Sequence, residues 1–132
     1  MIDIAHTGTD PVQYRIDPER RIVHVTLRGA VTFADLSAMQ ADILEDPSYC
    51  SEMAVYLDCR VVTAIPSHEQ IRKLALDRLF RSASIPPAKL AMVAMTRLGF
   101  ALASAIEAFL DAPKSQVRVF TSHVEARDWV SG

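Results

Sequence analysis

The fold is decided by four successive segments, KLAMVAM (residues 89–95), TRLGFALASAIEAFLD (96–111), VRVF (117–120) and TSHVEARDWV (121–130). Buried parallel strands read as short, continuous apolar runs, and parallel strands need long connections, usually helices, between them. Apolar runs alternate here with helical patterns. The second half of the chain therefore predicts a layered α/β domain.

The first half of the chain predicts a hairpin. Residues 12–16 and 22–27 are two apolar-rich runs, and Asp17 and Pro18 between them favour a tight turn. In the second run the apolar positions are denser than in the first, which is typical of a strand with a better-covered face. We expect the first run to be the edge strand.

Capping residues mark the starts of four helices, at Thr32, Ser67, Thr96 and Thr121. The first of these helices is expected to end at Asp46 and Pro47, and the second near Arg81. Further strands are expected at 53–57, 89–95 and 117–120, and a loop at 60–66.

The resulting order is β, β, α, β, α, β, α, β, α. It predicts a mostly parallel five-stranded sheet that begins with a β-hairpin, and parallel units of this kind wind in one direction. Residues 1–11 are expected to be a flexible lead-in, because Gly8, Asp10 and Pro11 punctuate them. Residues 12–132 are expected to form a single domain.

Composition excludes several classes of partner. The chain has 132 residues, half of them hydrophobic, and a net charge of −2 with both signs mixed along it. We therefore expect no nucleic-acid binding and no polybasic membrane anchor. The longest apolar segment, 98–110, is too short to insert into a membrane, which takes about 20 residues. The first residues lack a secretory pattern, so a cytoplasmic location is expected.

Cofactor and metal motifs are missing from the sequence. The four glycines are isolated, whereas dinucleotide and phosphate loops need several close together. The four histidines show neither the HExxH motif nor a pairing with cysteine at zinc-ligand spacing. We expect no cofactor and no metal site.

Polar residues gather where the predicted parallel strands end, which is where ligands of such sheets usually bind. Arg60, Ser67 and His68 follow one strand, and Thr96 and Arg97 follow the next. Helix starts there offer free N–H groups, so these five residues are the predicted binding set, with an anion as one candidate ligand. The alternative is that the hydroxyls are only helix caps and the arginines are solvated.

Two further patterns leave alternatives open. Cys59 and His68 could form a nucleophile and its base. However, Cys59 alternates in step with the apolar residues of its strand and so points to the same side as they do, which favours an inert buried thiol. Leu76, Phe80 and Phe100 lie off the main apolar stripes of their helices. They could form an apolar interface, line a ligand groove, or pack the two helices together.

The chain resembles the SpoIIAA-like proteins, relatives of the STAS domains of anti-sigma-factor antagonists and sulfate transporter tails. The segments that carry the resemblance are YRIDPERRIVHVTLRGAVT (14–32), VYLDCRVVTAIPS (55–67) and QVRVFTSHVEARDWV (116–130). The resemblance implies a βα superhelix.

The antagonist branch of that family implies phosphorylation of Ser67 by a partner kinase. The antagonists carry Asp before this serine and Ser and Gly after it, whereas this chain has Pro66, His68 and Glu69. Distant members of the fold bind lipids in an apolar cavity, which implies an apolar-ligand protein as an alternative.

Together these patterns predict a non-catalytic regulatory or binding module of the SpoIIAA/STAS type. It would recognise a protein partner or a small ligand and could form a homodimer through apolar helical surface. The alternatives are an apolar-ligand binding protein and a small enzyme that uses Cys59 and His68.

Overall fold

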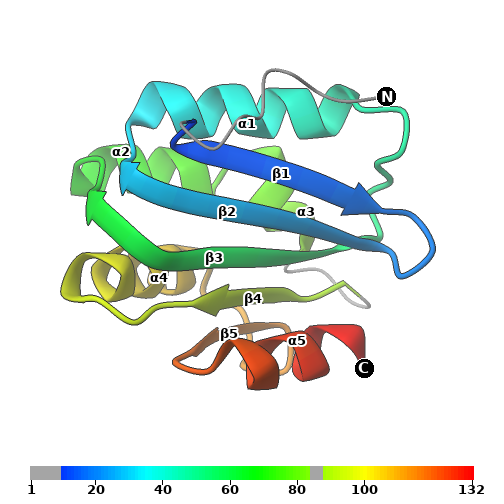
Figure 1. Ribbon diagram of the computed structural model, residues 1–132. Coiled ribbons are helices and arrows are strands. Elements are labelled where there is room, and N and C mark those ends of the chain that lie inside the picture. Colours follow the sequence, from blue (N-terminus) through cyan, green and yellow to red (C-terminus); the bar gives the residue numbers. More distant parts are fainter. Residues whose placement is uncertain (1–9, 84–87) are drawn as a thin grey trace.

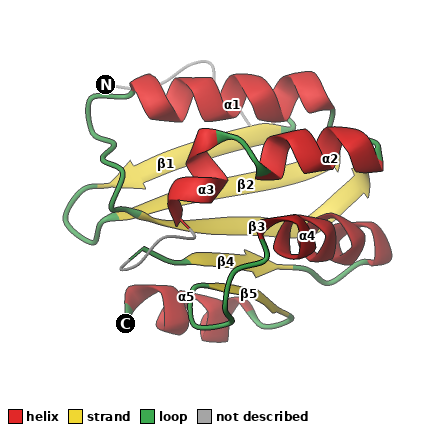
Figure 2. Cartoon of the chain, turned by 180° about the vertical axis from the view of Figure 1, so that it is seen from behind, coloured by secondary structure: helices red, strands yellow, loops and turns green. Residues whose placement is uncertain are grey.

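The structure of the chain, a computed structural model, describes residues 10–83 and 88–132, so the predicted lead-in lies largely outside the described residues. Five strands form one sheet with helices on both faces (Figures 1 and 2). The strands are β1 (Val12–Asp17), β2 (Ile22–Ala30), β3 (Ala54–Ala64), β4 (Leu90–Val93) and β5 (Val117–Phe120). The helices are α1 (Phe33–Glu45), α2 (His68–Ala75), α3 (Arg78–Ala83), α4 (Arg97–Leu110) and α5 (His123–Ser131).

The sheet topology confirms the predicted α/β class. The strands follow one another in chain order, β1-β2-β3-β4-β5. β1 pairs antiparallel with β2, and every later pair is parallel. Figure 2 shows α1, α2, α3 and α4 on one face of the sheet, with α5 behind it. Because the strand order never reverses, the described sheet has no switch-point crevice of the kind that holds nucleotides in doubly wound folds.

Most of the predicted helix caps are present. The Thr32 hydroxyl accepts the Asp35 N–H at 3.1 Å, and the Asp35 carboxylate accepts the Thr32 N–H at 3.2 Å. Ser67 forms the same reciprocal pair with Gln70. The last cap was wrongly predicted at Thr121: the N-cap of α5 is Ser122, whose hydroxyl accepts the Glu125 N–H.

The core has two parts of unequal size. The large part lies between the sheet and helices α1 to α4. It takes Met53, just before β3, and the alternate β3 residues Val55, Leu57 and Cys59. The small part lies on the other face, where α5 covers Ala91, Val93 and Phe120. No helix in the described part of the chain is long and apolar enough to cross a membrane.

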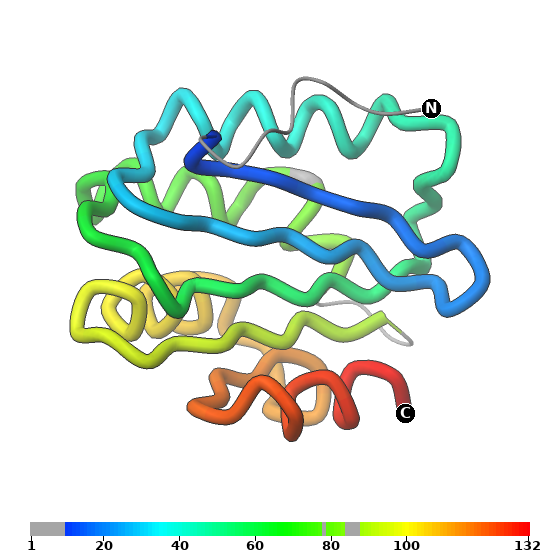
Figure 3. The backbone as a smooth tube through the Cα atoms, viewed as in Figure 1, coloured from blue at the N-terminus to red at the C-terminus, as the bar shows by residue number. Residues whose placement is uncertain are grey.

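The predicted loop at 60–66 is wrong, because β3 continues to Ala64. β3 pairs with β4 only as far as Asp58. Beyond that point β3 bends away from β4 and continues to pair with β2 (Figure 3). A register shift accommodates the bend, since Thr26 pairs with Asp58 but Arg28 pairs with Val61. Val62, in this last part of β3, is buried in the core.

The predicted helix from Ser67 to Arg81 is also wrong, because it is two helices that meet at Leu76 and Asp77. In one continuous helix, Leu76 and Phe80 would lie on the same side, away from the apolar stripe that faces the core. The break separates them: Phe80 is only 1% exposed, while Leu76 is 41% exposed. The turn thus brings the apolar residues of α3 into the core.

Candidate functional site

The predicted binding residues do not form one site. Thr96 and Arg97 lie with Phe100 in a hollow at the ends of β4 and β5. Arg60 lines a different hollow, on the face of the sheet opposite α1 to α4. The remaining two, Ser67 and His68, start α2 and line neither hollow.

The first hollow, which we call the β4–α4 corner, has a volume of about 560 Å³ and is lined by Ala94, Met95, Thr96, Arg97, Phe100, Ala101, Ser104 and Thr121. It forms because α4 begins immediately beside the sheet. The Thr96 hydroxyl caps α4 by accepting the Gly99 N–H at 3.0 Å. Gly99 itself packs so closely on β3 that a Cβ there would lie 2.3 Å from the Cys59 carbonyl oxygen. Only glycine allows this approach.

Apolar side chains at the β4–α4 corner remain in contact with solvent. Met95 is 64% exposed and Phe100 is 47% exposed, and both line the hollow. Arg97 is exposed beside them and forms no ion pair with a described residue. The sequence singled out Phe100 but missed Met95, because Met95 continues the apolar run of a buried strand.

Ser67 and His68 have structural contacts of their own. Ser67 is an exposed helix cap, held by the hydrogen bonds to Gln70 described above. The His68 ring packs against Phe109, with 4.8 Å between ring centroids, and so joins α2 to α4. Phe109 lies near the end of α4, three turns away from Thr96. The start of α2 is therefore apart from the β4–α4 corner.

Cys59 does not have the environment of a nucleophile. Its side chain is completely buried, and burial raises the pKa of the thiol. The neighbouring Asp58 carboxylate raises that pKa further. A thiol in this environment stays protonated at neutral pH, whereas reactive cysteines lie in electropositive, accessible surroundings. Because His68 is exposed and rests on Phe109, the hypothesis of a Cys59 and His68 pair gains no support.

The expected apolar set is also divided by the structure. Phe80 belongs to the core, so it lines neither an interface nor a groove with Leu76 and Phe100. The two exposed members lie at the end of α2 and at the start of α4.

In the described part of the chain, no group of three His, Cys, Asp or Glu side chains could hold a metal ion.

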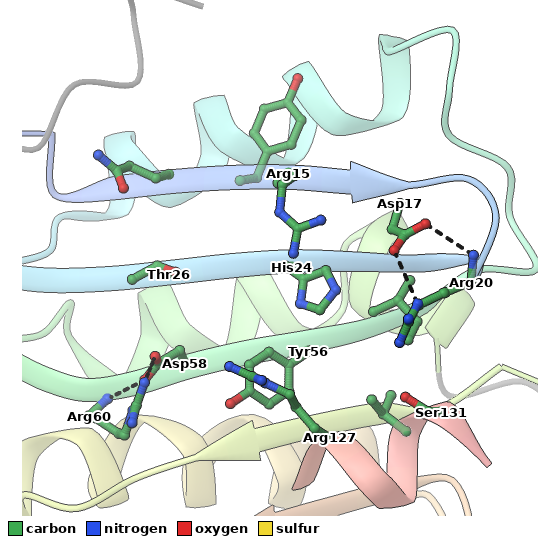
Figure 4. A pocket seen from close by; sticks show the side chains of 14 residues that line it. Arg15, Asp17, Arg20, His24, Thr26, Tyr56, Asp58, Arg60, Arg127 and Ser131 are labelled. Atoms are coloured by element: carbon green, nitrogen blue, oxygen red, sulfur yellow. Dashed lines mark hydrogen bonds and ion pairs between the residues drawn. The ribbon is translucent and has the colours of Figure 1, made fainter. Parts of the chain in front are cut away.

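The second hollow is a polar site of whose lining residues the sequence predicted only Arg60. It has a volume of about 700 Å³ and lies over β1, β2 and β3 beside α5 (Figure 4). The residues that line it are Gln13, Tyr14, Arg15, Asp17, Arg20, Ile22, His24, Thr26, Tyr56, Asp58, Arg60, Arg127, Val130 and Ser131. We call it the open-face pocket.

Strand register explains the composition of the open-face pocket. Arg15 pairs with His24 across β1 and β2, and His24 pairs with Tyr56 across β2 and β3. These three side chains therefore stand in one row, since paired residues point to the same face. The His24 and Tyr56 rings meet edge to face, with centroids 5.7 Å apart.

Carboxylates in the open-face pocket already have partners. Asp58 accepts two hydrogen bonds from the Arg60 guanidinium, at 2.9 and 2.8 Å, and a third from the Arg60 N–H. These bonds raise the pKa of Arg60. Asp17 caps the β1–β2 turn through the Arg20 N–H and faces the Arg20 side chain at 3.8 Å.

Comparison with known proteins identifies the fold. No protein-family model matches the sequence, and no curated protein matches it. The structure is similar to the crystal structure of an uncharacterized protein from Shewanella loihica, a DUF3478 family member with a SpoIIAA-like fold. The two share 15% identity over 94% of this chain and 97% of that one, with a TM-score of 0.59. This likeness confirms the predicted SpoIIAA-like fold.

Proposed function

We propose that the chain is a non-catalytic binding module that recognises a protein partner through the β4–α4 corner. The observation that carries the proposal is the exposure of Met95 and Phe100 in one hollow. Large apolar side chains that share an exposed hollow mark interaction sites more often than scattered ones do. The SpoIIAA-like fold supports a regulatory or binding role of this kind, and function must still be argued from the site.

A protein surface fits the β4–α4 corner better than a small apolar molecule. Pockets for small ligands enclose most of the ligand's surface. Here the lining Met95 and Phe100 side chains are themselves about half exposed or more, so a small molecule would stay largely in water. A protein can cover the whole hollow and bury both side chains. Arg97 at the edge favours a partner that offers a carboxylate beside an apolar group.

Ser67 enters the proposal as a helix cap. Phosphorylation there, which the SpoIIAA resemblance implies, would add negative charge at the start of α2, where the helix dipole tolerates it. Glu69 lies within the same first turn and would oppose that charge. Peptide fragmentation by mass spectrometry of protein purified from the source cells would locate an added phosphate on Ser67.

A pair of matched variants tests the partner proposal. Phe100→Ser removes an apolar side chain from the β4–α4 corner, and Leu76→Ser removes one of similar exposure elsewhere. Proteins that are captured from the source cells by the wild type and by Leu76→Ser, but not by Phe100→Ser, are then purified and titrated by calorimetry. We expect one of them to bind about tenfold or more weakly to Phe100→Ser, the loss typical of a central apolar contact.

Three results would overturn the proposal. One is that no purified candidate distinguishes Phe100→Ser from the wild type. A second is self-association in sedimentation that Phe100→Ser abolishes, which would assign the corner to a second copy of the chain. The third is a bound apolar small molecule in native mass spectra of the wild type that Phe100→Ser lacks.

A further inference from the structure

Two arginines of the open-face pocket have no carboxylate partner among the described residues. Of its four arginines, Arg60 is paired with Asp58 and Arg20 lies beside Asp17. Arg15 and Arg127 form no ion pair with any described residue. The pocket therefore holds a surplus of two guanidinium groups.

The two unpaired guanidinium groups converge on the His24 and Tyr56 row. Arg15 stands beside His24 on β1, and Arg127 reaches over Tyr56 from α5 (Figure 4). Burial lowers the pKa of His24, and the charges of Arg15, Arg127 and Arg20 lower it further, while the Asp17 carboxylate opposes them without reversing the shift. The imidazole is therefore held neutral between two cations, and the surroundings favour an added negative charge.

Tyr56 supplies an unused hydrogen-bond donor to this row. The residue is 5% exposed, and its buried hydroxyl makes no hydrogen bond with a described residue. Burial and the Asp58 carboxylate raise the pKa of this hydroxyl, whereas the Arg60 and Arg127 guanidinium groups lower it. A guanidinium can only donate, so the proton of the Tyr56 hydroxyl stays available for an acceptor. A buried hydroxyl without a partner has lost its hydrogen bond to water, so an incoming acceptor would recover that interaction.

We propose that the open-face pocket binds the phosphate group of a small phosphomonoester. A phosphomonoester carries a charge of about −1.5 to −2 at neutral pH, which matches the two unpaired guanidinium groups. Its three terminal oxygens can accept from Arg15, from Arg127 and from the Tyr56 hydroxyl. The pocket volume of about 700 Å³ leaves room for an organic group attached to the phosphate.

This site is separate from the β4–α4 corner, because the two pockets share no lining residue. If the corner proves to bind no protein partner, the phosphate proposal is unaffected. If the open-face pocket proves to bind no phosphate, the partner proposal is unaffected.

The test follows the His24 ring by NMR while phenyl phosphate is added to the full chain at constant ionic strength. We expect saturable shifts and a rise in the pKa of His24, because the bound anion offsets the two arginines. Arg15→Gln and Arg127→Gln should each weaken binding about tenfold or more, because each removes a charge-assisted hydrogen bond to the phosphate. The control Arg72→Gln removes an exposed arginine of α2 and should bind like the wild type.

Inorganic phosphate and sodium chloride form the comparison arms. Weaker binding of inorganic phosphate than of phenyl phosphate would support an organic phosphate as the ligand. Equal binding of the two would overturn the organic part of the proposal and assign the pocket to free phosphate. The proposal fails if chloride produces the same His24 shifts, or if both arginine variants bind phenyl phosphate as tightly as Arg72→Gln does.

Discussion

Replacing Gly99 by alanine should destabilise the protein, although alanine is the better helix former. Gly99 lies in the first turn of α4, and a Cβ there would be 2.3 Å from the Cys59 carbonyl oxygen. Non-bonded heavy atoms attract only at about 3.5 Å and beyond, so α4 and β3 would have to separate by about 1 Å. The obstacle is backbone, which cannot rotate away as a side chain could.

The magnitude follows from two opposing effects. Alanine gains about 1 kcal/mol over glycine within a helix. Overpacking typically costs about 1–3 kcal/mol, and we expect the upper end because Leu102 and Ile106 on the same face of α4 are buried against the core. The free energy of unfolding of Gly99→Ala should therefore fall by about 2 kcal/mol.

Urea unfolding, followed by circular dichroism and by Trp129 fluorescence, measures this change. Ala101→Gly is the matched control, since Ala101 is an exposed position in the same helix and should lose only the propensity difference of about 1 kcal/mol. If Gly99→Ala is as stable as the wild type or more stable, the close approach of α4 to β3 is wrong, and so is the shape of the β4–α4 corner.

Three other predictions concern single side chains. Ser67→Ala should lower the free energy of unfolding by about 1 kcal/mol in urea melts, because the α2 cap is lost; no change would contradict the cap. A thiol reagent at neutral pH should label the exposed Cys50 in the native protein and Cys59 only after unfolding, and rapid native labelling of both would contradict the burial of Cys59. Because the fold lowers the pKa of His24, the unfolded chain takes up a proton first as pH falls below about 6.5. Stability should therefore decrease with falling pH by more in the wild type than in His24→Gln, and parallel pH profiles of the two would refute this.

Local signals in the sequence predicted most of the fold. The caps at Thr32 and Ser67 follow from short-range hydrogen-bond patterns, and the parity of Cys59 follows from strand periodicity. The predictions failed where distant partners decide the outcome. β3 extends because β2 pairs with its end, and the helix breaks after Ala75 because the core takes Phe80.

The open-face pocket was missed for the same reason. Arg15, His24 and Tyr56 are far apart in the chain, and only strand register places them in one row. A usable signal was nevertheless present. In three strands that lie side by side in the sheet, polar residues alternate with apolar ones, so their side chains point to one face. This pattern indicates a sheet face without a helix over it.

The open face itself follows from the number of strands. Adjacent strands lie about 4.8 Å apart, and a helix with its side chains is about 10 Å wide, so one helix covers about two strands. Crossovers that wind in one direction place α1 to α4 on one face and leave only α5 for the other (Figure 2). α5 lies over β4 and packs against β3 and β5 on either side, so that β1 and most of β2 stay open beside it (Figure 1). Openness is therefore a property of the fold, and evidence for a ligand has to come from the chemistry of the open strands. Among the described residues, Arg15 and Arg127 have no carboxylate partner and the Tyr56 hydroxyl has no acceptor, and these three groups supply that chemistry here.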